Sequence, residues 1–111
     1  MEAAFQVEAA YDQILAMNAA AAADGHFEVA YHLLMSALHC AEDARNPAWL
    51  SEVAARAREQ RHVVDALSPP HRLSTVSSHA GVSIFETTAR MAEAVTQRLS
   101  NERRTAQLRR R

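Results

Sequence analysis

Between Gly25 and Ala41 the apolar residues recur at steps of three and four, which is the repeat of one face of an α-helix. That face comprises Phe27, Ala30, Tyr31, Leu34, Ala37, Leu38 and Ala41. The other face is polar, with Glu28, His32, Ser36, His39 and Asp43. A glycine commonly follows the end of a helix. The stretch therefore predicts an αα-hairpin, with one helix over about residues 2–24 and a second over about 26–44.

The first helix of this hairpin has a weaker apolar pattern. Its predicted stripe is Val7, Tyr11, Ile14, Asn18 and Ala21, widened by Phe5, Leu15 and Met17. Residues 19–23 are all alanine. Alanine has a high helix propensity and the shortest side chain after glycine. We expect this run to let a neighbouring helix approach closely.

Capping signals place two more helices. Asn46-Pro47 combines a favoured N-cap with a favoured first helical residue, so a third helix is predicted over about 47–67. Its predicted buried face is Trp49, Leu50, Val53, Ala54, Ala57, Val64 and Leu67. Ser68-Pro69-Pro70 ends that helix, and residues 68–82 read as a long connection that includes at most a short helical turn.

The fourth helix is predicted over about 84–108, after a capping box of Ser83 and Glu86 with Val82 as the staple residue. Its stripe is Ile84, Phe85, Thr88, Met91, Ala92, Val95 and Leu99. Beyond Leu99 the sequence is polar on every face, so the last turns should project from the body or fray.

These elements predict one all-α domain over residues 1–111, built as an antiparallel four-helix array. The array is either a closed bundle or a short layer of two hairpins. The chain has 24 alanines against nine leucines, so its core buries less apolar area per residue than a leucine-rich core. Self-association would stabilise such a fold.

The first hairpin resembles a tetratricopeptide-type (TPR-like) repeat, through Gly25 in the turn followed by Phe27, Ala30, Leu34 and Ala37. Ile14 and Met17 match large positions of the first repeat helix. Residues 46–67 resemble the first helix of a next repeat. Asn18, Ala21 and Glu42 depart from the family pattern. The resemblance covers about half the chain, and implies a scaffold that binds peptides or proteins and has no catalytic residues.

Charge is divided between the two halves of the chain. Residues 1–55 carry a net charge of −7, whereas residues 56–111 carry +6, and every basic residue is arginine. This polarity is satisfied either within one molecule or by pairing between molecules. Because pairing would also enlarge a modest core, we expect a homodimer or another protein as the partner.

Several classes of function find no support in the sequence. No run of about 18 apolar residues is present, so a membrane span is not expected. A single cysteine favours a reducing cytoplasm. Cys40 has no base four residues away, and the Ser and His residues of the 68–82 connection lack a nucleophile-elbow motif. We therefore predict a protein that is not an enzyme and has no cofactor.

The polar face of the second helix offers a weak metal-binding pattern. Glu28 with His32 and His39 with Asp43 are i,i+4 pairs, each able to supply two ligands. His32 and His39 are about 10.5 Å apart along a helix, which is too far for one zinc ion. A metal- or small-ligand-binding bundle is one alternative function, and it would need ligands from another helix.

The basic C-terminus supports a second alternative. Its arginines are Arg103, Arg104, Arg109, Arg110 and Arg111. Arginine matches phosphate geometry, so a nucleic-acid-associated regulatory protein is conceivable. The chain's isoelectric point of about 6.6 is low for that class. Cations also favour a helix C-terminus for electrostatic reasons.

The function predicted from the sequence is a small cytoplasmic protein-interaction or adaptor module. Aromatic residues commonly anchor such contacts, so Trp49, Tyr11, Tyr31 and Phe27 are the expected core or groove anchors. In a repeat-like array the groove is lined by the first helix of each hairpin. The predicted partner-binding residues are therefore Gln13, Asn18, Glu52 and Arg56.

Overall fold

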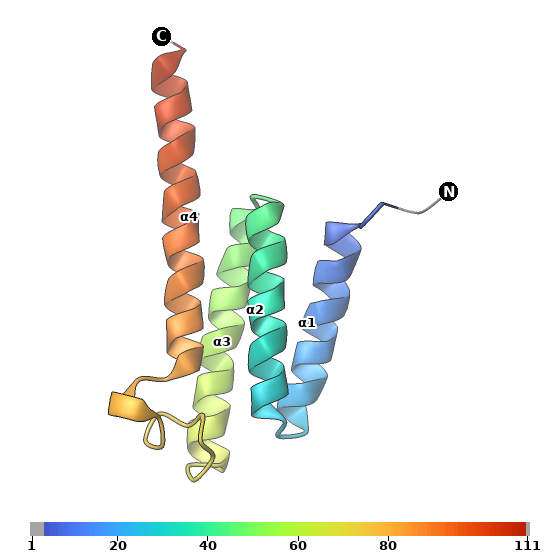
Figure 1. Cartoon of the computed structure of the whole chain (residues 1–111), viewed down its shortest axis with the longest axis vertical. Helices are drawn as coiled ribbons and strands as arrows, with labels where there is room; N and C mark the ends of the chain where they lie inside the picture. Colours follow the sequence, from blue (N-terminus) through green and yellow to red (C-terminus); the bar gives the residue numbers. More distant parts are fainter. Residues whose placement is uncertain (1–3, 111) are drawn as a thin grey trace.

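A computed structural model describes residues 4–110, and within them the fold is all-α, as predicted (Figure 1). The helices are α1 (Val7–Ala23), α2 (Phe27–Asp43), α3 (Pro47–Leu67) and α4 (Ile84–Arg109). A single 3₁₀ turn, η1 (His79–Gly81), interrupts the connection before α4. No strand occurs between residues 4 and 110.

The helices form an open array rather than a closed bundle. Consecutive helices run antiparallel, and α1 and α4 lie at opposite edges of the molecule (Figure 1). The Cα atoms span 55 × 41 × 17 Å, so the array is flat. Helix α2 contacts each of the other three helices, which makes it the central element.

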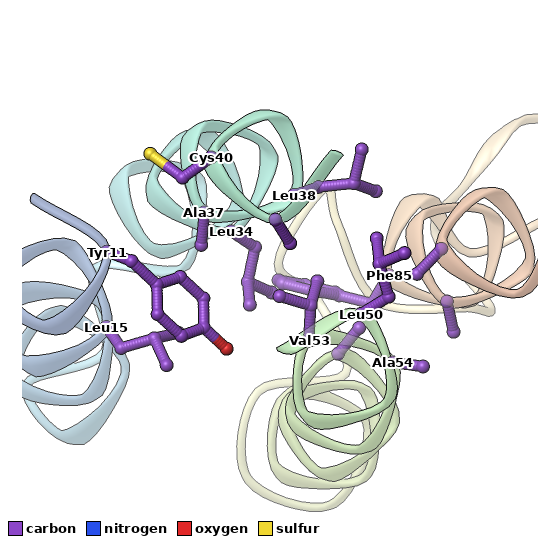
Figure 2. Packing of buried hydrophobic residues seen from close by; sticks show 14 of the residues in the cluster. Tyr11, Leu15, Leu34, Ala37, Leu38, Cys40, Leu50, Val53, Ala54 and Phe85 are labelled. Carbon is purple, nitrogen blue, oxygen red and sulfur yellow. The ribbon is translucent and has the colours of Figure 1, made fainter. Parts of the chain in front are cut away.

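The core is assembled from the apolar face predicted for α2. Leu34, Ala37, Leu38 and Ala41 are buried there, and Tyr31 packs edge-on against Phe85 of α4. Figure 2 shows α2 and α3 on two sides of the buried cluster, with α1 and α4 at its ends. The alanines at the contacts allow these helices to approach closely.

Two predicted helix starts depend on caps that the structure confirms. Asn46 Oδ1 accepts a hydrogen bond from Trp49 N at 3.1 Å. Ser83 Oγ accepts from the backbone N–H groups of Phe85 and Glu86 at 3.2 and 3.3 Å. The turn before α2 is made by Gly25, whose φ of +78° suits a residue without Cβ.

The prediction that the first helix begins near residue 2 is wrong in its described part. Residues 4–6 are not helical, and α1 begins at Val7 because the backbone of Gln6 is extended, with φ −101° and ψ 95°. Residues 2 and 3 lie outside the described residues.

Several apolar residues predicted to be buried are exposed instead. They lie before α1, on the uncovered edge of the array, at the end of α3 or beside the start of α4. They are Phe5, Met17, Leu67, Val82 and Met91. Helical periodicity identifies one face of a helix, but an open array covers only part of the faces of its outer helices.

The connection of residues 68–82 is organised by its own hydroxyl groups. Ser74 is fully buried and donates to Pro69 O at 2.6 Å, and Ser78 Oγ donates to Ser74 O at 2.5 Å. Thr75 donates through N and Oγ1 to the Asp65 carboxylate, both at 2.7 Å. The connection is therefore tied to the end of α3.

The charge polarity of the chain is partly satisfied within the molecule. Three exposed ion pairs join the two halves: Arg72 with Glu28, Arg98 with Glu42 at 2.7 Å, and Arg45 with Glu102 at 2.5 Å. Exposed pairs of this kind add little stability.

A less exposed ion-pair network joins α3 to α4. Its centre is Glu86, which was expected to complete a capping box with Ser83. The Glu86 carboxylate accepts from Arg58 at 3.0 Å and from Arg61 at 3.1 Å instead of returning to Ser83. The hydrogen bond from Arg58 is the main cause that holds the Glu86 pKa below its ordinary value of 4.5. The ion pair therefore stabilises the folded state when Glu86 is ionised.

Glu86→Gln should lower the urea midpoint at neutral pH, because the network loses its shared carboxylate. A lowered pKa in the folded state means that this stabilisation is complete above about pH 4.5 and is lost as pH falls through the folded-state pKa. The difference between variant and unaltered protein should therefore shrink below pH 4.5. Urea titrations followed by Trp49 fluorescence at several pH values measure this.

Glu59→Gln is the matched control, since Glu59 has no ion-pair partner within residues 4–110. If the difference in urea midpoint between Glu86→Gln and the unaltered protein stays constant down to pH 3, the role given to this network is contradicted.

Candidate functional site

The candidate site is a groove between α1 and α3, with a volume of about 410 Å³. Its walls are Ala19, Ala22 and Ala23 on α1 and Arg56, Glu59, Gln60 and Val63 on α3. The alanine run was expected to permit close approach of a neighbouring helix. Ala19 and Ala23 are instead exposed. Their short side chains leave the space above the α1–α3 contact unfilled, and that space is the groove.

The floor of the groove is a pair of buried side-chain amides. Asn18 Nδ2 donates to Gln60 Oε1 at 3.1 Å, and Gln60 Nε2 donates back to Asn18 Oδ1 at 2.6 Å. Asn18 Nδ2 also donates to Ala30 O at 2.7 Å, so one side chain ties α1 to both α2 and α3. Reciprocal hydrogen bonds fix both amide planes, which makes this floor rigid.

Closer to the N-terminus of α1, Tyr11 connects α1 to α3. Its ring stacks on Trp49 with centroids 4.3 Å apart and planes 8° from parallel. Its hydroxyl donates to Glu52 Oε1 at 2.6 Å. Burial, followed by the hydrogen bond to Glu52, raises the pKa of Tyr11, so the phenol stays protonated. The stack sets the spacing between α1 and α3.

Glu59 is the one acidic residue that lines the groove among the described residues, and further acids lie along the same helix faces beyond it. On α1, Glu8 and Asp12 precede Ala19 and Ala23 at helical spacing, so the four residues share one stripe. On α3, Glu52 and Glu59 flank Arg56 at the same kind of spacing. The Arg56 guanidinium is engaged, because Nη1 donates to Leu15 O at 3.2 Å. The groove lining therefore carries one carboxylate and one arginine, and the adjoining turns of α1 and α3 add the carboxylates of Glu8, Asp12 and Glu52.

The four predicted partner-binding residues differ in their positions relative to the groove. Arg56 lines the groove, whereas Glu52 accepts a hydrogen bond from the Tyr11 hydroxyl and is not a lining residue. Gln13 is exposed but does not line the groove. The assignment of Asn18 as a partner contact is wrong, since its side chain is fully buried and completes the floor.

Sequence reasoning missed several residues of the groove. Glu59 and Val63 continue the stripe of Glu52 and Arg56 along α3, so their spacing was a usable signal. Gln60 was not identified because a polar residue on a predicted apolar face gives no hint of its partner. Among the predicted anchors, Tyr11 and Phe27 are core residues, while Tyr31 and Trp49 are partly exposed.

The last ten described residues, which include the end of α4, form a separate basic surface. Every residue from 101 to 110 is exposed, and Figure 1 shows this end of α4 extending past the other helices. The prediction that the last turns project is confirmed. Arg103, Arg104, Arg109 and Arg110 have no carboxylate within ion-pair distance in the described part of the chain. Arg111 lies outside the described residues.

The histidine pattern of α2 does not come together as a metal site in the described part of the chain. Glu28 forms an ion pair with Arg72, and the hydrogen bond from Arg72 lowers the Glu28 pKa. His32, His39 and Asp43 remain exposed on one face. Between residues 4 and 110, no group of three or more His, Cys, Asp or Glu side chains could hold a metal ion.

The residues considered as nucleophiles are either hydrogen-bonded to the backbone or buried. Ser74, Ser77 and Ser78 donate to backbone carbonyls of the 68–82 connection. Cys40 is buried beside α1, and burial is the main cause that raises its thiol pKa. A raised pKa keeps the thiol protonated and weakens it as a nucleophile.

Comparison with known proteins does not assign the chain to a family. The chain matches no protein-family model, no curated protein and no solved structure. The resemblance of the first hairpin to tetratricopeptide repeats stays a prediction. None of the helices in the described part of the chain combines the length and apolar character needed to cross a membrane.

Asn18→Ala should destabilise the protein by about 1–3 kcal/mol, because it leaves the buried Gln60 amide without its partner. Urea denaturation followed by Trp49 fluorescence measures the change. Replacing both amides, as Asn18→Leu with Gln60→Leu, should restore much of the loss, since no buried polar group is then left unpaired.

Gln97→Ala is the control, because it removes an exposed amide that donates to Asn101 on the same helix. It should change the free energy of unfolding by less than about 0.5 kcal/mol. If Asn18→Ala behaves like this control, the amide pair does not hold the floor of the groove.

Proposed function

We propose that this chain is a non-enzymatic protein-interaction module that binds a basic segment of a partner protein in the α1–α3 groove. The observation that carries the proposal is the groove itself, with alanine walls, a rigid amide floor and an acidic surround. The proposal keeps the cytoplasmic location predicted from the single cysteine.

The shape of the groove supports a peptide segment as the ligand. Ala19, Ala22, Ala23 and Val63 offer apolar surface, and the short alanine side chains leave room for a backbone to lie between the helices. The volume of about 410 Å³ is in the range of sites that take a few side chains. Because the Asn18–Gln60 pair is already formed, binding needs little reorganisation of the floor.

The charge around the groove supports a basic ligand. Glu8, Asp12, Glu52 and Glu59 create a negative potential, which attracts cationic segments and raises their rate of association. The same electrostatics would repel an acidic peptide or a nucleic acid. Since these carboxylates are close to solvent, salt should weaken the interaction.

A second candidate function has one favourable observation. The projecting end of α4 presents Arg103, Arg104, Arg109 and Arg110 on an exposed helix, which is suitable for phosphate contacts. The rest of the molecule works against it, because the chain's net charge is −1. Binding of a labelled DNA duplex at low salt, lost on charge reversal of these arginines, would support nucleic-acid association.

The groove can be tested with a synthetic probe. The probe is a fluorescein-labelled, alanine-rich helical peptide with four arginines, compared with the same peptide carrying glutamates. Fluorescence anisotropy should show salt-sensitive binding of the arginine peptide only. Ala19→Arg, which adds bulk and positive charge to the groove wall, should weaken binding at least about tenfold, equivalent to about 1.4 kcal/mol.

Ala20→Arg is the matched control, since Ala20 is an exposed α1 residue that does not line the groove. This variant adds the same side chain to the same helix and should bind the probe almost normally. Equal binding of both peptides, or equal weakening by both substitutions, would argue against the groove as the binding site.

A further inference from the structure

The projecting end of α4 and the α1–α3 groove carry opposite, unsatisfied charge. Most other arginines are committed: Arg45, Arg58, Arg61, Arg72, Arg90 and Arg98 all form ion pairs. Residues 101–110 are here called the basic tail. Their four arginines form no ion pair within the described residues. Glu8, Asp12, Glu52 and Glu59 likewise have no cationic partner there.

One molecule cannot satisfy these charges by itself. Helix α4 forms one edge of the array and α1 forms the other, and the end of α4 extends away from the C-terminal end of α1 (Figure 1), whose residues Ala19, Ala22 and Ala23 line the groove. The tail is a continuous part of α4 with helical geometry up to Arg109, so it does not fold back. A second copy has no such restriction.

The dimensions of the two surfaces agree. Residues 101–109 are helical and extend about 13.5 Å, at a rise of 1.5 Å per residue. Arg103 and Arg109 are about 9 Å apart along the tail by the same rise. Glu52 and Glu59 are about 10.5 Å apart along α3. Ala106 shares one side of the helix with Arg103 and Arg109, at three-residue spacing, and is small enough to face the alanine wall closely.

We propose that the basic tail of one molecule binds in the acidic α1–α3 groove of a second copy, and that two molecules exchange tails reciprocally in a two-fold dimer. The tail and groove are different surfaces of one chain, so a two-fold arrangement makes the same contact twice. This inference rests on the proposed function, because it names the occupant of the same groove.

Charge complementarity favours a second copy over a nucleic acid. A nucleic acid bound to the tail would leave the groove acids unpaired and would meet the repulsion of the acidic half of the chain. Tail exchange neutralises both surfaces together.

The test is the molar mass of the full chain, measured by light scattering on a sizing column. At about 0.05 M NaCl the mass should be twice the chain mass of 12.3 kDa. At about 0.5 M NaCl, where charges are screened over a shorter distance, the dimer dissociation constant should rise at least about tenfold. A mass of 12.3 kDa at both salt concentrations overturns the proposal.

A charge swap identifies the contact. Arg103→Glu with Arg109→Glu gives the tail variant, and Asp12→Arg with Glu59→Arg gives the groove variant. Each should be monomeric alone, because like charges then meet. Mixing the two should restore a dimer, since each reversed surface meets its opposite in the other variant. Failure of the mixture to dimerise overturns the proposal even if both variants are folded by circular dichroism.

Asp24→Arg with Asp43→Arg is the matched control. It reverses two exposed acids of the same hairpin that do not line the groove, and it should remain dimeric. If this control also becomes monomeric, the effect belongs to net charge, and the assignment of the contact is overturned.

The tail variant separates this inference from the proposed function, because its groove is free. If the full chain is monomeric while the tail variant binds the arginine peptide, tail exchange fails and the groove function stands. If the tail variant does not bind the peptide, the groove function fails. If the variant keeps the dimer mass but loses binding of a labelled DNA duplex, the tail serves nucleic acid instead.

Discussion

The packing of α2 against its three neighbouring helices holds the array together. Its buried face uses small and branched residues in turn, such as Ala37 beside Leu34 and Leu38. This alternation lets three helices reach one helix without leaving large voids. Because α2 occupies the centre, α1 and α4 are left at the edges, and each keeps a face that no other helix covers. The uncovered faces explain why Met17 and Met91 are exposed although they follow apolar periodicity.

The link between α1 and α3 is of a different kind, and the groove results from it. These two helices meet through polar and aromatic side chains: the Asn18–Gln60 amides, the Tyr11–Trp49 stack and the Arg56 hydrogen bond to Leu15 O. Such contacts hold two helices at a set distance at a few points without filling the space between them. With alanine at the remaining α1 positions, the space stays open. Alanine therefore has two effects in this fold: in the core it lets helices approach closely, and on the exposed side of α1 it leaves the groove open.

The electrostatic character of the molecule combines local pairing with unpaired ends. The network around Glu86 and the three pairs between the halves engage most of the arginines outside the basic tail. Among the described residues, charge without an ion-pair partner remains on the basic tail of α4 and on acids that include Glu59 in the groove and Asp12 and Glu52 beside it. Surfaces of opposite charge on one rigid body are suited to association between bodies, because the fold prevents them from meeting internally.

The helices follow from local sequence signals, since periodicity, the Asn46-Pro47 and Ser83 caps and the Gly25 turn act within a few residues. The end of the apolar stripe of α4 at Leu99 likewise predicted that the last turns project or fray. The site, in contrast, depends on tertiary contacts. Whether Asn18 is a partner contact or a buried floor depends on Gln60, which is 42 residues away. Whether the alanine run is packed or open depends on the spacing between α1 and α3. Both are set by long-range contacts that no short stretch of sequence encodes.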